Sequence, residues 1–188
     1  SLAELRGEIE PVDESALARF LIGWHGIDSG ARGAAAVAEA VDRLQGADIP
    51  ASVLERDVLA ARLGEGASGV LDQLMLEGQI VWIGRGSLGP RDGKVALYAR
   101  HQVTRLALDP AGDAPSEPLH DAIRRCLEDR GASFFADIYA AVGGGDPNEV
   151  LDALWDLVWA GEVTNDTFAP VRAFTARRRG GGRPRHLP

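Results

Sequence analysis

The sequence predicts a mainly α-helical protein with short β-hairpins, an α+β class, in which a docking helix precedes two tandem winged-helix domains. One observation is an internal repeat: an amphipathic helix ends at a glycine, and a short β-branched strand follows at once. With Gly161 aligned on Gly78, apolar residues fall on apolar residues: Leu154 on Leu71, Leu157 on Leu74 and Val163 on Ile80. The other is the length of 188 residues, which suits two units of roughly 70 to 80 residues.

Residues 1–29 are predicted to form the docking segment. Its apolar residues follow the spacing i, i+3, i+4 and i+7 on one helical face: Leu17, Phe20, Leu21 and Trp24. Asp13 is the expected N-terminal cap, and Gly26 the expected end. Because this helix precedes the first repeat, we interpret it as a helix that docks on another surface.

Residues 30–108 are predicted to form the first winged-helix unit. Three helices are expected, between Gly30 and Gly46, from Pro50 to about Leu63, and from a cap at Ser68 onward. Two strand-like runs, Gln79 to Gly84 and Lys94 to Arg100, enclose a loop rich in turn residues. This loop is typical of the wing of such a unit.

Residues 109–115, rich in proline and glycine, are predicted as a linker, and residues 116–176 as the second winged-helix unit. Its third helix has the strongest start signal in the chain, namely a capping aspartate, a proline and a capping-box glutamate: Asp146, Pro147 and Glu149. The tight turn Asn165-Asp166 predicts a shortened wing. Residues 177–188 read as a basic flexible tail or tether.

The net charge of −8 has the wrong sign for a protein whose whole surface binds nucleic acid. The third helices carry acids without Arg or Lys, which opposes insertion into the major groove: Asp72 and Glu77, then Glu149, Asp152 and Asp156. Cations lie instead in the wing and beyond Ala169. We therefore predict contacts to the DNA backbone, or equally well solvated charges, at these positions: Arg85, Arg91, Lys94, Arg172, Arg177, Arg178 and Arg179.

Two tryptophans of the last predicted helix are candidates for stacking on a base. Trp155 shares an apolar face with Leu151 and Val158, which favours packing in the core. Trp159 is expected to be partly exposed and is therefore the stacking candidate.

Known catalytic motifs are missing from the sequence, so no catalytic residue is predicted. The match to Gly-x-Gly-x-x-Gly at residues 84–89 lies between two strands, which favours a wing over a dinucleotide site. The four histidines are scattered, so neither a metal site nor a cofactor is expected here. The single cysteine, Cys126, favours a reducing cytoplasm, and no apolar run suits a membrane span.

Three passages carry a family resemblance: Ala153–Arg172, which includes Leu-Trp-Asp-Leu-Val-Trp-Ala-Gly and Val-Thr-Asn-Asp, with Phe20–Gly26 and Gly93–Tyr98. Over roughly Val12 to Arg179 the chain resembles the C-terminal extension of the Lhr (large helicase-related) family of bacterial ATP-dependent DNA helicases. The resemblance implies a far larger polypeptide whose helicase core, absent here, binds ATP and Mg²⁺. It also implies tandem winged-helix units followed by a β-barrel, self-assembly, and similarity to winged-helix DNA glycosylases.

From these observations we expect a non-catalytic winged-helix module of a DNA helicase involved in DNA repair. Its expected function is to promote assembly of the protein and to guide the DNA backbone without reading its sequence. Its expected partners are single-stranded or duplex DNA, other domains of the same polypeptide, and a second copy, but no membrane. One alternative is a glycosylase-like module acting on a damaged or uracil base, for which the sequence nominates no activating carboxylate or amide. The other is a protein-binding adaptor, which the acidic third helices favour.

Overall fold

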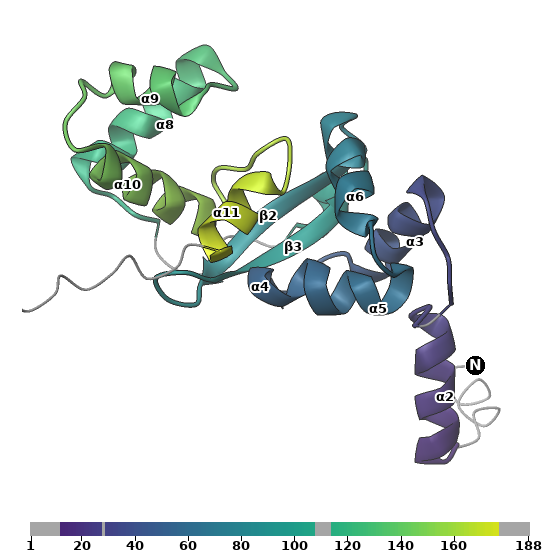
Figure 1. Cartoon of the computed structure of the whole chain (residues 1–188). Helices are drawn as coiled ribbons and strands as arrows, with labels where there is room; N and C mark the ends of the chain where they lie inside the picture. Colours follow the sequence, from purple (N-terminus) through teal and green to yellow (C-terminus); the bar gives the residue numbers. More distant parts are fainter. Residues whose placement is uncertain (1–11, 28, 108–113, 177–188) are drawn as a thin grey trace, which may run out of the picture.

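The structure is a computed structural model that describes residues 12–27, 29–107 and 114–176. The described chain is mainly helical and contains one three-stranded antiparallel sheet, in the order β1-β3-β2. This confirms the α+β class (Figure 1). Most of the predicted linker and the predicted tail, residues 177–188, lie outside the described residues.

Helix α2 spans Glu14–Trp24 and confirms the predicted first helix. The Asp13 carboxylate accepts a 2.6 Å hydrogen bond from the Ala16 amide, as a cap should. No residue of α2 is buried, and the helix stands away from the other elements (Figure 1).

The first unit packs helices against one face of a β-hairpin. In α3 (Ala34–Leu44) the buried residues recur with helical spacing: Val37, Ala40, Val41 and Leu44. The next helical stretch consists of α4 (Ala51–Val53), the π-helical η1 (Leu54–Leu59) and α5 (Ala60–Leu63). These elements confirm the helices expected from residue 30 to residue 63.

Helix α6 spans Ala67–Leu76, and the predicted cap at Ser68 is wrong. Gly66, with a φ of 94°, turns the chain into the helix, so Ser68 already lies in its first turn. Leu71, Leu74 and Met75 face the core. The outer face of the helix carries Gly69, Gln73 and Leu76.

The sheet confirms the predicted hairpin. Strands β2 (Ile80–Ser87) and β3 (Gly93–Ala99) pair with Trp82 opposite Leu97, and a bulge interrupts the register between Gly84 and Ser87. The short strand β1 (Ile49–Pro50) pairs with the other side of β3, so β2 is an edge strand. Helix α7 (Val103–Leu106) follows the sheet.

The second unit begins with three helices, α8 (Pro118–Arg130), α9 (Phe135–Ala141) and α10 (Pro147–Trp159). Their small core consists of Ile123, Cys126, Ile138, Ala153 and Leu157. Asp146 caps α10 through a 2.8 Å bond from the Asn148 amide, and Pro147 takes the first helical position, as predicted.

The shortened wing predicted around Asn165 and Asp166 is not formed, because residues 160–168 contain no strand. The chain instead returns to the first unit and ends its described part in α11 (Ala169–Ala176). The Thr164 hydroxyl donates a 2.6 Å hydrogen bond to the Trp82 carbonyl, and the Phe168 amide donates a 2.9 Å bond to Asp72. Residues 164–176, which we call the return segment, therefore cover the edge strand β2 where a second hairpin was expected (Figure 1).

The return segment completes the core of the first unit. Phe168 and Val171 are about 1% exposed or less and pack with residues of α3, α6 and the sheet. The Phe168 ring meets the Trp82 ring edge-on at 5.8 Å, and the Trp82 indole nitrogen donates to the Thr167 carbonyl at 3.1 Å. The end of α10 and the return segment therefore belong to the core of the first unit, while α8, α9 and the rest of α10 enclose the smaller second core.

Candidate nucleic-acid interface

The wing is the turn between β2 and β3, residues 88–92. The Leu88 amide donates to the Asp92 carbonyl at 2.9 Å, which closes the turn. The Asp92 carboxylate accepts hydrogen bonds from the Ser52 amide at 3.2 Å and from the Ser52 hydroxyl at 2.6 Å. The base of the wing is thus tied to the start of α4, while Arg91 is exposed in the turn and Lys94 is half-buried beside it on β3.

Arg85 does not lie in the wing, contrary to the prediction. It belongs to β2, is 8% exposed, and places its Nε 3.2 Å from the Asp48 carboxylate. The bulge after Gly84 shifts the alternation of the strand, so that Gly84 and Arg85 are both buried. This arginine is part of the interior and is not presented to DNA.

Arg172 was predicted as a DNA contact, but the structure uses it to hold the return segment in place. Its Nε donates a 2.6 Å hydrogen bond to Glu55, and its Nη2 forms an ion pair at 2.7 Å with Asp72 without hydrogen-bond alignment. Burial would lower the pKa of Arg172, but its contacts with the Glu55 and Asp72 carboxylates outweigh this effect and raise the pKa. Asp72, which was expected to repel phosphate, is thus paired with Arg172 in the structure.

The expectation that Trp159 is partly exposed is wrong, because its exposed fraction is 6%. Its ring stacks on Trp155 at 5.3 Å and meets Phe174 at 5.4 Å. The ring also lies against Gly93, where an added Cβ would come within 2.5 Å of it. Trp159 therefore joins α10 to the sheet and cannot stack on a base without leaving the core.

Of the seven predicted backbone contacts, Arg91 lies in the wing and Lys94 lies just beyond it on β3. Arg177, Arg178 and Arg179 lie outside the described residues. In the part of the chain that is described, no group of three metal-ligating side chains lies close enough to hold an ion. None of its helices is long and apolar enough to cross a membrane.

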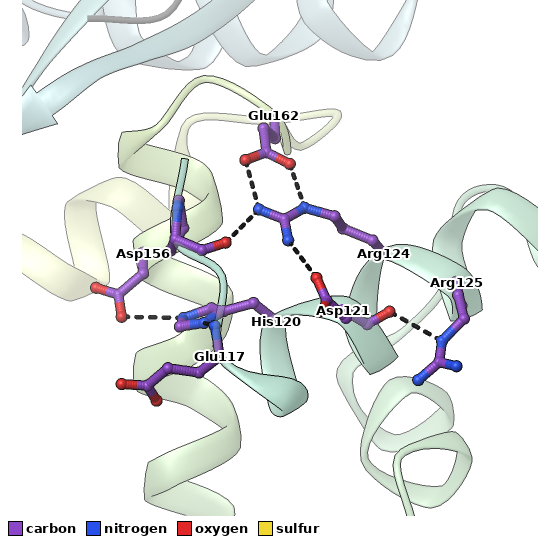
Figure 2. A network of polar contacts seen from close by, with 8 residues as sticks. Glu117, His120, Asp121, Arg124, Arg125, Asp156 and Glu162 are labelled. Atoms are coloured by element: carbon purple, nitrogen blue, oxygen red, sulfur yellow. Dashed lines mark hydrogen bonds and ion pairs between the residues drawn. The ribbon is translucent and has the colours of Figure 1, made fainter. Parts of the chain in front are cut away.

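A polar network that joins α8 to Asp156 and Glu162 was not predicted from the sequence (Figure 2). Arg124 binds both carboxylate oxygens of Glu162, at 2.6 and 2.8 Å, and donates to Asp121 at 2.8 Å. The buried His120 accepts at Nδ1 from the Glu117 amide at 3.2 Å, and its Nε2 lies 3.3 Å from Asp156. The spacing of Glu117 and His120, which form a capping box at α8, was the signal available in the sequence.

The Glu162 carboxylate should make stability depend on acid pH. Hydrogen bonds from Arg124 hold the pKa of Glu162 below its ordinary value of 4.5. A lowered pKa in the folded state stabilises the protein above the unfolded-state pKa, and this contribution disappears as the pH falls through the folded-state pKa. We expect Glu162→Gln to lower the melting temperature at pH 7 and to reduce its fall below about pH 4.5.

Melting curves between pH 7 and pH 3 check this expectation, with Glu65→Gln as the control at an exposed carboxylate. The control should follow the parent protein at each pH. If Glu162→Gln also followed the parent protein throughout, the pair with Arg124 would make no contribution to stability.

A cavity of about 290 Å³ lies between the second unit and the return segment. Its walls are mainly apolar and aromatic and include Phe135, Trp155 and Val158. Its polar lining residues are Ser133, Thr164, Asn165 and Asp166. This cavity was not predicted from the sequence, because the return segment that forms part of its wall was expected to be a hairpin.

A helical body followed by a hairpin wing defines a winged-helix domain. The family model for the winged-helix domain of the large helicase-related protein matches residues 12–100. The chain belongs to this Lhr family.

Two curated relatives match nearly all of this chain. It is 38% identical over 188 residues to the Lhr helicase/probable uracil glycosylase of Mycolicibacterium smegmatis, covering 99% of this chain and 12% of that protein. It is 34% identical over 183 residues to the Lhr helicase/uracil glycosylase of Escherichia coli, covering 93% of this chain and 11% of that protein. The chain thus spans about one eighth of the length of these relatives.

Proposed function

We propose that this chain is a structural module of an ATP-dependent DNA helicase and that its wing binds the DNA backbone without reading sequence. The observation that carries the proposal is the wing, which is fixed at its base by Ser52 and Asp92, with Arg91 in its turn and Lys94 just beyond it on β3. Paired cations on a fixed hairpin suit phosphate contacts, which position DNA but specify no base.

The outer face of α6 also supports DNA binding without sequence readout. In a winged-helix protein that reads sequence, this helix would enter the major groove with basic or amide side chains. Here its exposed residues are Gly69, Gln73 and Leu76, with Glu77 at the C-terminal end. This face has one amide and no cation, so it supports neither strong phosphate binding nor sequence readout.

The wing proposal predicts weaker DNA binding by the double variant Arg91→Ala, Lys94→Ala. Loss of two phosphate contacts should lower the affinity for single-stranded and duplex DNA and reduce the slope of log K against log salt by about 2. Fluorescence anisotropy over a salt series measures both quantities. The matched control is Arg100→Ala, because Arg100 is an exposed cation beyond the opposite end of β3.

Unchanged affinity and slope in the double variant would contradict the wing proposal and favour the protein-binding adaptor. An equal loss in Arg100→Ala would show that general charge, and not the position of the wing, controls binding.

We infer that ATP and Mg²⁺ are bound by a helicase core outside this chain, and that the module contributes to assembly and to a role in DNA repair. The family membership supports these inferences. The cytoplasmic location suggested by the single cysteine stays a prediction.

The cavity supports a second candidate function, recognition of an extrahelical base. Its volume of about 290 Å³ is near the lower limit of small-molecule sites, roughly 300 Å³. Aromatic walls and an adjacent amide and carboxylate, Asn165 and Asp166, are the groups that bind a flipped base and activate its removal. Both relatives carry uracil glycosylase in their names.

The test of this second function is Asp166→Asn in the full-length polypeptide, assayed on a uracil-containing single strand. If the cavity is the reactive site, base release should fall by about 10²-fold or more, as expected when a general acid or base is lost. The control is Asp152→Asn, an exposed carboxylate on α10 that does not line the cavity. Equal activity of both variants would exclude Asp166 from the reaction.

A further inference from the structure

The apolar face of α2 has no cover within the described chain. The large apolar side chains of this face are exposed by 41 to 59%: Leu17, Phe20, Leu21 and Trp24. The Phe20 and Trp24 rings stack on each other at 5.7 Å. Scattered apolar residues are common on protein surfaces, but a continuous helical face of this kind marks an interaction site.

The C-terminal end of α2 is fixed to the first unit, although the rest of the helix stands away from that unit (Figure 1). The Arg43 guanidinium lies 5.8 Å from the centre of the Trp24 ring. Gly26, at φ 63°, turns the chain, and the Ser29 hydroxyl donates to the Arg62 carbonyl at 3.3 Å. The C-terminal end of the helix is thus tied to the first unit, while the apolar side chains Leu17, Phe20 and Trp24 stay exposed by 49 to 59%.

The helix needs a partner to be stable. Isolated helices shorter than about 12 to 15 residues are marginal in water, and α2 has 11 residues. Its cap at Asp13 supports the first turn but covers none of the apolar face. Most of the stability of such a helix must come from burying its apolar side against another surface.

Other domains of a longer polypeptide could supply that surface. The family model begins at residue 12, so it includes α2 within the domain although α2 packs on none of that domain's core. The chain accounts for about 12% of the length of a relative, so most of the polypeptide is available as a partner. A partner in the same polypeptide acts at an effective concentration of order mM, which favours it over a second copy at μM concentration.

We propose that α2 docks, apolar face first, into an apolar groove on another domain of the same polypeptide. The mode is that of an amphipathic helix in a groove, with Leu17, Phe20 and Trp24 among its anchors. The wing plays no part in this contact, so the proposal does not depend on DNA binding.

Amide hydrogen exchange of the peptide spanning residues 13–26 tests the proposal, in the full-length polypeptide and in the 188-residue chain at the same concentration. We expect at least about tenfold slower exchange in the full-length polypeptide, independent of protein concentration. The double variant Leu17→Ser, Phe20→Ser should abolish this protection while leaving the exchange of α3 and the sheet unchanged, because no residue of α2 is buried. The matched control is Leu106→Ser, a helical leucine exposed by 42% on α7.

Three results would overturn the proposal. The first is equally fast exchange of residues 13–26 in both proteins. The second is protection that rises with protein concentration, since this would identify a second copy as the partner. The third is full protection in the double variant, since the apolar face would then not be the docking surface.

Discussion

Replacing Trp159 by alanine should lower the free energy of unfolding by about 3–5 kcal/mol. The indole is 6% exposed and fills the space between α10, the sheet and α11, in contact with Trp155, Phe174 and Gly93. Its removal leaves a cavity that the surrounding backbone can close only in part. Because Trp159 joins the two units, the loss should appear as a lower denaturation midpoint for the whole chain, measured by circular dichroism in urea.

The matched control is Trp24→Ala. Trp24 is exposed by 55%, and its ring stacks on Phe20 and lies 5.8 Å from the Arg43 guanidinium. Its loss should cost less than about 1 kcal/mol, within the range of surface substitutions and weak cation–π contacts. Equal losses in the two variants would contradict the assignment of Trp159 to the core of the first unit.

The second large effect is expected at Gly84→Ala. A Cβ at this position would lie 1.9 Å from the Val158 carbonyl oxygen and 2.8 Å from the Val158 carbonyl carbon. Both atoms belong to the backbone, so no side-chain rotation can relieve the overlap, and α10 must move away from β2. We expect a loss of about 1–3 kcal/mol or more. The movement should also expose the Trp159 indole, which fluorescence emission at longer wavelength would detect.

Gly69→Ala controls for the general effect of adding a methyl group to a glycine. Gly69 is helical, has a negative φ, and an added Cβ there would meet no atom within 4 Å. Alanine should therefore leave the stability unchanged or raise it by up to about 1 kcal/mol through helix propensity. If Gly84→Ala were as harmless as Gly69→Ala, the close approach of β2 and α10 would not limit the packing of the two units.

Local patterns in the sequence were sufficient to predict most helices and the first hairpin. Periodic apolar residues define α3 and α10, and the caps at Asp13 and Asp146 form as expected. These signals act over one or two helical turns, so they can be read without knowing the fold.

The candidate site was predicted less well, because its side chains have partners far away in the sequence. Arg85 pairs with Asp48, and Arg172 pairs with Glu55 and Asp72, which both lie far earlier in the sequence. Neither pairing leaves a periodic signal, so both arginines looked like candidates for DNA contact. The prediction of a second hairpin was wrong for a related reason, because the Thr164 hydroxyl donates to the Trp82 carbonyl on β2 and residues 160–168 form no strand.

The return segment has a consequence for the order in which the protein can fold during synthesis. A ribosome that has released residues 12–100 has made the whole of the matched winged-helix domain. Two fully buried residues of that domain's core, Phe168 and Val171, are still to be translated. Contacts of such long sequence separation form late and slow the folding reaction. The nascent first unit should therefore stay loosely packed, and susceptible to proteases, until α11 has left the exit tunnel.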